Sequence, residues 1–143
     1  MTIYLFDFDN TIVELPYPET LNYMDTDESL EPSLGFKIIK RTKKDYKDVV
    51  QQNNGPIFLL SNRVSKVKES LKRTLNTLGY KFDDYYLITD EDRHKGNRVK
   101  KILEKYPGCN HIKYWEDKDK HIDSVTETLK EYPNIKLEVV KTI

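Results

Sequence analysis

The sequence predicts a three-layer α/β fold in which helices cover both faces of a central parallel sheet. Two observations carry this prediction. Short apolar or β-branched runs alternate with amphipathic helical patterns, and polar side chains directly follow several of these runs. Alternating strands and helices form units whose strands lie parallel. The carboxyl ends of parallel strands share one sheet edge, where α/β proteins bind ligands.

The expected strands are short and rich in residues that favour strands, and they lie at 3–8, 56–60, 85–89, 111–115 and 135–140. Apolar side chains recur at helical spacing between them, which predicts helices at 64–78, 97–105 and 120–132.

The segment from about 14 to 55 breaks this rhythm. A helix ending near Gln52 is expected to lead into the second strand, but the first half has three prolines and no apolar periodicity. The segment follows the first strand, so it lies beside the predicted ligand-binding edge as a small lid or a long loop. The missing periodicity favours the loop. We therefore expect one domain, 1–143, with a small insertion or loop at about 14–55.

Composition narrows the possible partners. Lys plus Arg and Asp plus Glu balance at 24 each, so any nucleic-acid footprint has to be local. The basic stretch Lys37–Lys47 either contacts a nucleic-acid backbone or is a solvated helix face, which is the commoner case. Cys109 stands alone, and no apolar run reaches membrane-spanning length. We expect a soluble, cytoplasmic protein with no membrane partner.

The first predicted strand runs straight into two carboxylates, Asp7 and Asp9, and the chain then turns. Alternation along a strand places both on the same side. Two acids this close repel each other unless a cation or a shared proton compensates. This pattern is typical of an active site that needs a metal, a nucleophile or an acid/base pair.

Further polar groups follow the later elements in sequence order: Ser61, Asn62 and Arg63 at the expected helix start, Lys95 at the next helix, and Glu116 with Asp117 after the fourth strand. All are expected to converge on one sheet edge. Carboxylate oxygens select Mg²⁺, while amides, Lys and Arg hold phosphate oxygens. The set suits phosphoryl chemistry with a hard divalent ion.

These residues resemble the ordered motifs of the haloacid dehalogenase (HAD) superfamily. Asp-Phe-Asp-Asn-Thr-Ile, beginning at Asp7, is similar to its first motif, DxDx[TV]. Leu-Leu-Ser-Asn-Arg resembles the second motif, Lys95 the third, and Trp-Glu-Asp, ending at Asp117, the fourth. The resemblance covers residues 3 to about 129 and implies a Rossmann-like HAD fold and a Mg²⁺-dependent phosphatase.

The resemblance also implies separate roles. Asp7 attacks phosphorus to form an aspartyl-phosphate, while Asp9 protonates the leaving oxygen and then activates water. Ser61 binds the phosphoryl group and Lys95 neutralises it, with Lys100 and Lys101 as the alternatives to Lys95. Mg²⁺ is held by Asp7, the carbonyl of Asp9 and Asp117, with Glu116 acting through water.

Other interpretations stay open for several of these residues. Ser61 also suits a helix N-cap. Asn62 and Arg63 are the further substrate-binding candidates, and a surface ion pair is the alternative for Arg63. His121 either orients the acids before it or is an ordinary helix-start residue.

Within the superfamily, Ser61-Asn62-Arg63 is similar to the Ser-Gly-Arg of polynucleotide 3′-phosphatases. Residues 116–121 resemble the "EDR..H" ending of the Swiss-army-knife RNA-repair-like HAD domains. There are departures: Lys118 replaces Arg, Asn62 replaces Gly, and His121 stands where many HAD enzymes carry a second acid.

The number of residues between the second and third motifs indicates the size of substrate that the site can admit. The interval from Ser61 to Lys95 fits one helix and one strand, which leaves no room for a large cap domain. An uncapped site admits a phosphate at the end of a polymer, so we expect activity on nucleic-acid ends or another large phosphorylated substrate. The alternatives are a HAD phosphatase for small nucleotide or sugar phosphates, and a non-catalytic HAD-like binding domain.

Overall fold

The computed structural model describes residues 1–89 and 92–142. Its centre is a sheet of five parallel strands in the order β5-β4-β1-β6-β7. The strands are β1 (Thr2–Phe6), β4 (Ile57–Val64), β5 (Asp84–Ile88), β6 (His111–Glu116) and β7 (Lys136–Lys141). A short antiparallel pair, β2 (Val13–Glu14) with β3 (Lys37–Ile38), stands beside this sheet.

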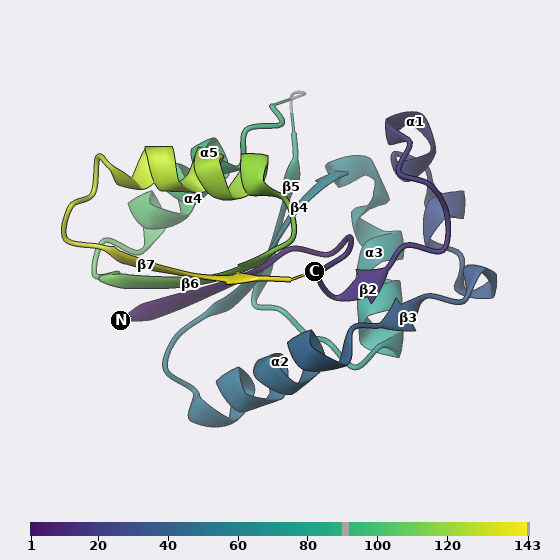
Figure 1. The fold of residues 1–143 in the computed structure, drawn as a ribbon, viewed down its shortest axis with the longest axis horizontal. Helices are drawn as coiled ribbons and strands as arrows, with labels where there is room; N and C mark the ends of the chain where they lie inside the picture. Colours follow the sequence, from purple (N-terminus) through teal and green to yellow (C-terminus); the bar gives the residue numbers. More distant parts are fainter. Residues whose placement is uncertain (90–91, 143) are drawn as a thin grey trace.

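Two helices cover each face of the sheet (Figure 1). One face carries α2 (Lys40–Gln52) and α3 (Lys68–Thr77), and the other carries α4 (Lys95–Lys105) and α5 (Asp119–Leu129). Alternation along β1 divides the core, because Tyr4 and Phe6 pack on the α2–α3 side while Ile3 and Leu5 pack on the α4–α5 side. The predicted three-layer α/β fold is therefore confirmed.

The segment between β1 and β4 contains α2 and, before it, only short elements. These are α1 (Leu21–Met24) and the 3₁₀ turns η1 (Asp27–Leu30) and η2 (Pro32–Leu34). Leu30 is buried in the same core cluster as Phe6. The helix expected to end near Gln52 is confirmed as α2.

The start of the helix after β4 differs from the prediction. The sequence predicts a helix from residue 64, whereas β4 continues to Val64, a 3₁₀ turn, η3 (Ser65–Val67), follows, and α3 begins at Lys68. A register shift between Leu60 and Val64 lets the strand continue past the point where its pairing with β5 is interrupted. Ser61 therefore lies inside a strand, and the predicted helix-start position is wrong.

Among the described residues, no helix is both long and apolar enough to span a membrane.

Candidate active site

Residues 7–13 form a tight loop at the carboxyl end of β1. The Asp7 amide donates to the Trp115 carbonyl at 3.0 Å, and the Ile12 amide returns to the Phe8 carbonyl at 3.0 Å. Asn10 turns the chain with a left-handed φ of 58°, a conformation that Asn adopts more readily than most residues. The loop holds Asp7 and Asp9 at the sheet edge, where both are almost completely buried.

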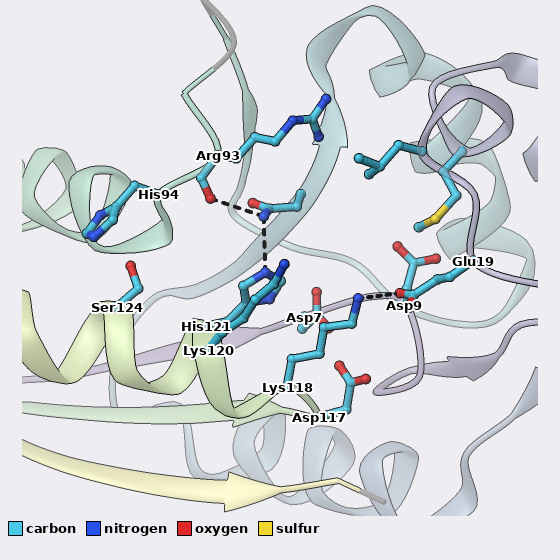
Figure 2. A pocket seen from close by; sticks show the side chains of 13 residues that line it. Asp7, Asp9, Glu19, Arg93, His94, Asp117, Lys118, Lys120, His121 and Ser124 are labelled. Carbon is cyan, nitrogen blue, oxygen red and sulfur yellow. Dashed lines mark hydrogen bonds and ion pairs between the residues drawn. The ribbon is translucent and has the colours of Figure 1, made fainter.

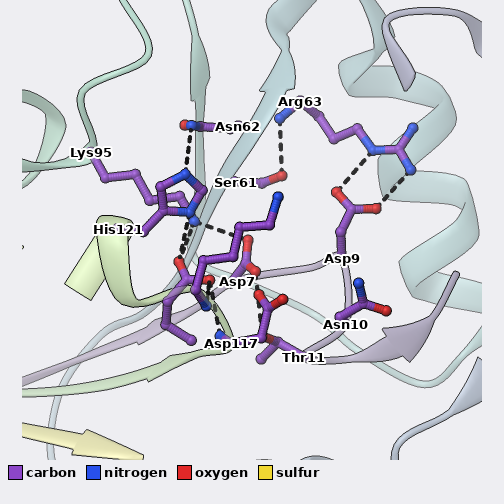
Figure 3. A network of polar contacts seen from close by, with 12 residues as sticks. Asp7, Asp9, Asn10, Thr11, Ser61, Asn62, Arg63, Lys95, Asp117 and His121 are labelled. Carbon is purple, nitrogen blue, oxygen red and sulfur yellow. Dashed lines mark hydrogen bonds and ion pairs between the residues drawn. The ribbon is translucent and has the colours of Figure 1, made fainter. Parts of the chain in front are cut away.

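Lys95 joins the first and fourth motifs. It is the first residue of α4 and is fully buried, and its Nζ donates to Asp7 Oδ1 at 3.0 Å and to Glu116 Oε1 at 2.6 Å (Figure 3). Burial opposes its charge, but the two carboxylates raise the pKa of Lys95 above its ordinary value. The structure thus brings Lys95 into contact with Asp7, in line with the expected convergence on one sheet edge.

Glu116 is surrounded by donors. Its Oε1 accepts from Lys95 and from the Tyr114 hydroxyl, the latter at 2.5 Å, and its Oε2 accepts the backbone amides of Asp117 and Lys118 at 3.0 and 3.3 Å. Although burial opposes ionisation, Lys95 holds the pKa of Glu116 well below its usual range. Glu116 is therefore an ionised anchor for Lys95.

Asp117 has the opposite surroundings. Its Oδ1 is buried without a hydrogen-bond partner among the described residues, and burial together with Glu116 raises the pKa of Asp117 to about 7. Burial and Glu116 also raise the pKa of Asp7, while Lys95 opposes the rise. Carboxylate oxygens of Asp7, Glu116 and Asp117 lie within 4.8 Å of one another. An unpartnered buried oxygen in an all-carboxylate cluster fits a hard divalent cation.

Arg63 pairs with Asp9 inside the protein. Its Nε and one terminal nitrogen donate to the two Asp9 oxygens at 3.1 and 2.7 Å, and Arg63 is fully buried. Its remaining donors bind the Met24 carbonyl, the Ser29 hydroxyl and the Tyr17 hydroxyl at 2.9, 2.6 and 2.6 Å. The predicted contact with a substrate phosphate and the alternative of a surface ion pair both disagree with this buried position.

Ser61 and Asn62 lie between these two groups. Ser61 is fully buried, and its Oγ accepts the Arg63 amide at 3.1 Å. Asn62 lines the pocket, but its amide nitrogen donates to the Arg93 carbonyl at 3.1 Å and lies 3.2 Å from His121 Nε2, while its oxygen accepts from Arg98. The other ring nitrogen of His121 is 3.3 Å from Glu116. His121 therefore lies between Asn62 and Glu116.

A pocket of about 450 Å³ opens above these residues (Figure 2). Asp7, Asp9 and Asp117 line its base, and cationic side chains line its wall. Two of these cations pair with acids of the segment before α2, Lys118 with Glu19 at 2.8 Å and Arg93 with Asp25 at 3.7 Å. The segment 19–25 therefore borders the pocket mouth.

Several residues that support the site were not found by sequence reasoning. Tyr17 and Ser29 bind Arg63 from a stretch without periodicity, and Tyr114 donates to Glu116 from within a strand. Thr142 lies 3.0 Å from the Thr11 hydroxyl, which itself donates to Asp7 at 3.3 Å. The contacts of Ser29, Tyr17 and Thr142 span 34, 46 and 131 residues, so they leave no local pattern in the chain.

No protein-family profile and no curated protein matches the sequence. Solved structures do resemble the fold. A chain of the Pnkp1/Rnl/Hen1 complex matches with a TM-score of 0.69 at 19% identity, over 99% of this chain and 45% of that chain. This chain thus spans less than half of that protein's length.

Two further structures match over most of both chains. The HAD domain of the effector Lem4 from Legionella pneumophila has a TM-score of 0.65 at 16% identity, over 98% of this chain and 85% of that chain. The haloacid dehalogenase-like hydrolase SP0104 from Streptococcus pneumoniae has a TM-score of 0.55 at 13% identity, over 99% and 95%. The protein therefore has a haloacid dehalogenase-like fold, as its motifs predicted.

Proposed function

We propose that this protein is a Mg²⁺-dependent phosphatase that hydrolyses a phosphomonoester through an aspartyl-phosphate on Asp7. The observation that supports this most is the contact of the buried Lys95 ammonium with the Asp7 carboxylate, beside the unpartnered oxygen of Asp117. A carboxylate needs no deprotonation to act as a nucleophile, and the adjacent cation offsets its repulsion from an anionic substrate.

Asp7 and Asp117 would hold the metal, together with the backbone carbonyl of Asp9. Glu116 belongs to this cluster but has both oxygens engaged by donors, so it would act on the metal only indirectly. Bound Mg²⁺ would supply positive charge that stabilises the phosphoryl oxygens.

The chemistry of the side chains then follows. An Asp7 oxygen attacks phosphorus, the bond to the leaving oxygen breaks, and Asp9 gives that oxygen a proton. Asp9 then takes a proton from water as the water attacks the aspartyl-phosphate, which releases phosphate and restores Asp7. Arg63 holds Asp9 in place by donating to both of its carboxylate oxygens, at 3.1 and 2.7 Å. Ser61 and Lys95 bind the phosphoryl oxygens.

We propose nucleic-acid ends as the substrate. The open pocket with a cationic wall and the small size of the segment 14–55 support a large anionic substrate. A chain of the Pnkp1/Rnl/Hen1 RNA repair complex also resembles this fold. This likeness supports nucleic-acid ends as the substrate class.

The experiment is a phosphatase assay with p-nitrophenyl phosphate, with and without Mg²⁺, on wild type and Asp7→Asn. We expect Mg²⁺-dependent turnover that falls at least about a hundredfold in the variant, since an amide cannot form the acyl-phosphate. Activity that survives this substitution would remove Asp7 as nucleophile. A clear preference for small sugar phosphates over 3′-phosphorylated oligonucleotides would show that the substrate proposal is wrong.

A further inference from the structure

The charge of this protein is unevenly distributed. The whole chain is neutral, with 24 basic and 24 acidic residues. Residues 37–47 hold six basic residues and one acid, a net charge of +5, so the rest of the chain carries −5. This concentration of charge falls on β3 and α2, on the side of the sheet away from α4 and α5 (Figure 1).

Five of these six basic residues, all of them lysines, line a groove of about 820 Å³, whose walls contain no acid among the described residues. Lys40, Lys44 and Lys47 follow one another at spacings of four and three residues, so they form a stripe along one side of α2 about 10 Å long. Phe36 and Ile38 give the same groove an apolar strip. Within the described part of the chain, the groove shares no lining residue with the pocket above Asp7.

Of the six cations, Lys43 is held by contacts within the fold. Lys43 donates to the Leu78 and Gly79 carbonyls, both at 2.7 Å, and lies over the Tyr80 ring. The other five, Lys37, Lys40, Arg41, Lys44 and Lys47, are exposed and form no ion pair with an acid of the described residues.

This arrangement is unfavourable for the helix itself. Its first turn contains no acid, whereas the positive end of a helix favours acids there. The lysines also stand three and four residues apart, where like charges repel, and burial together with Lys47 lowers the pKa of Lys43. The one acid of residues 37–47, Asp45, accepts from Trp115 Nε1 at 3.0 Å and does not line the groove. A bound polyanion would remove the repulsion.

We propose that this groove, the basic groove, binds the backbone of a single-stranded nucleic acid. A row of cations suits a linear polyanion, and ammonium groups bind phosphates as point charges. The aromatic and apolar strip gives bases a surface to pack on. A concave groove fits a strand better than the flat surface of a lipid bilayer. The proposal goes beyond the phosphatase reaction and does not depend on it.

The test measures fluorescence anisotropy of a labelled single-stranded oligonucleotide that ends in a 3′-hydroxyl and so is no phosphatase substrate. The variant carries Lys40→Gln, Lys44→Gln and Lys47→Gln together, three exposed lysines that line the groove. We expect binding at least about tenfold weaker, and a plot of log K against log salt that is less steep by about 2, because three phosphate contacts are lost at about 0.7 each.

A matched control carries Lys105→Gln, Lys130→Gln and Lys136→Gln, three exposed lysines outside the groove, on α4, at the end of α5 and on β7. Its net charge changes equally, and we expect its binding within about twofold of wild type. Thermal unfolding of the groove variant should match or exceed wild type because repulsion is relieved. Hydrolysis of p-nitrophenyl phosphate should be unchanged in both variants, which separates this proposal from the phosphatase proposal.

Three outcomes would overturn the proposal. The groove variant binds as wild type does, the control loses as much affinity as the groove variant, or the protein cosediments with anionic lipid vesicles through these residues while failing to bind the oligonucleotide.

Discussion

Asp9 and Arg63 show how a motif residue can take a different role from the one its position suggests. Arg63 stands two residues after the second-motif Ser61, but its side chain is fully buried and binds both oxygens of Asp9. The same guanidinium holds Tyr17 and Ser29 from the segment before α2. Five donors in a fixed plane make Arg suited to this junction, where a lysine would reach fewer partners.

At the residue scale, Glu116→Gln tests whether Glu116 anchors Lys95. We expect unfolding free energy to fall by about 1–3 kcal/mol, because the buried Lys95 ammonium and two backbone amides lose a charged acceptor, although Asp7 still pairs with Lys95. Urea denaturation monitored by circular dichroism measures this. Glu138→Gln is the control, because Glu138 pairs with Lys113 at the surface with 44% of its side chain exposed. Its effect should be about 1 kcal/mol or less. Equal effects of the two substitutions would contradict the anchoring role.

Some residues of the candidate site can be predicted from the sequence, whereas the partners of others cannot. The positions of Asp7, Lys95 and Asp117 were predictable because each directly follows or begins a regular element at one sheet edge, and Asp9 follows Asp7 by two residues. The partner of Arg63 was not, since burial of its side chain depends on Tyr17 and Ser29 in a segment without periodicity. The role of Glu116 likewise depends on Tyr114 and Lys95, which come together only in the folded sheet.

At the scale of elements, hydrophobic patterns in the sequence predict where the strands and helices lie. The same patterns predict the ends of these elements less accurately. The apolar pattern from Val64 to Leu78 predicts one helix, whereas the interrupted pairing of β4 with β5 extends the strand to Val64 and delays the helix to Lys68. Pairing between strands overrides the local preference there. Ser61 consequently reaches the site from a strand.

Close packing of α4 against α5 positions Lys95, and Gly96→Ala tests it. A Cβ on Gly96 would lie 2.6 Å from the Ser124 carbonyl oxygen and 2.1 Å from Thr128 Oγ1. Because backbone on α5 has to move, we expect a loss of about 1–3 kcal/mol in unfolding free energy, despite the better helix propensity of Ala. Phosphatase activity should fall as well, since Lys95 is the adjacent residue.

Gly108→Ala is the control for this substitution. A Cβ on Gly108 meets no atom within 4 Å, so its unfolding free energy should change by no more than about 0.5 kcal/mol. Thermal or urea denaturation of both variants gives the comparison. A stable, fully active Gly96→Ala protein would show that the helix contact does not set the position of Lys95.

At the scale of the whole molecule, the uneven balance of buried charge links stability to pH and metal. Three acids meet one lysine beside the pocket, and the pKa values of Asp7 and Asp117 are raised, that of Asp117 to about 7. A raised folded-state pKa contributes stability that is fully present below the unfolded value near 4 and is lost as pH rises through the folded value. The metal-free protein therefore loses this contribution between about pH 4 and pH 7.

Mg²⁺ should reverse this loss, because it binds the ionised carboxylates of the folded protein. We expect the rise in melting temperature with Mg²⁺, relative to EDTA, to be larger at pH 8 than at pH 5.

Burial lowers the pKa of His121, so its contribution to stability changes with the opposite sign near its ordinary pKa. Because the Mg²⁺ and EDTA samples are compared at the same pH, the contribution of His121 largely cancels in the difference between their melting temperatures. Asp117→Asn should reduce both the Mg²⁺ response and its pH dependence, whereas Glu138→Gln should preserve them. An equal response at both pH values would contradict metal binding by these acids.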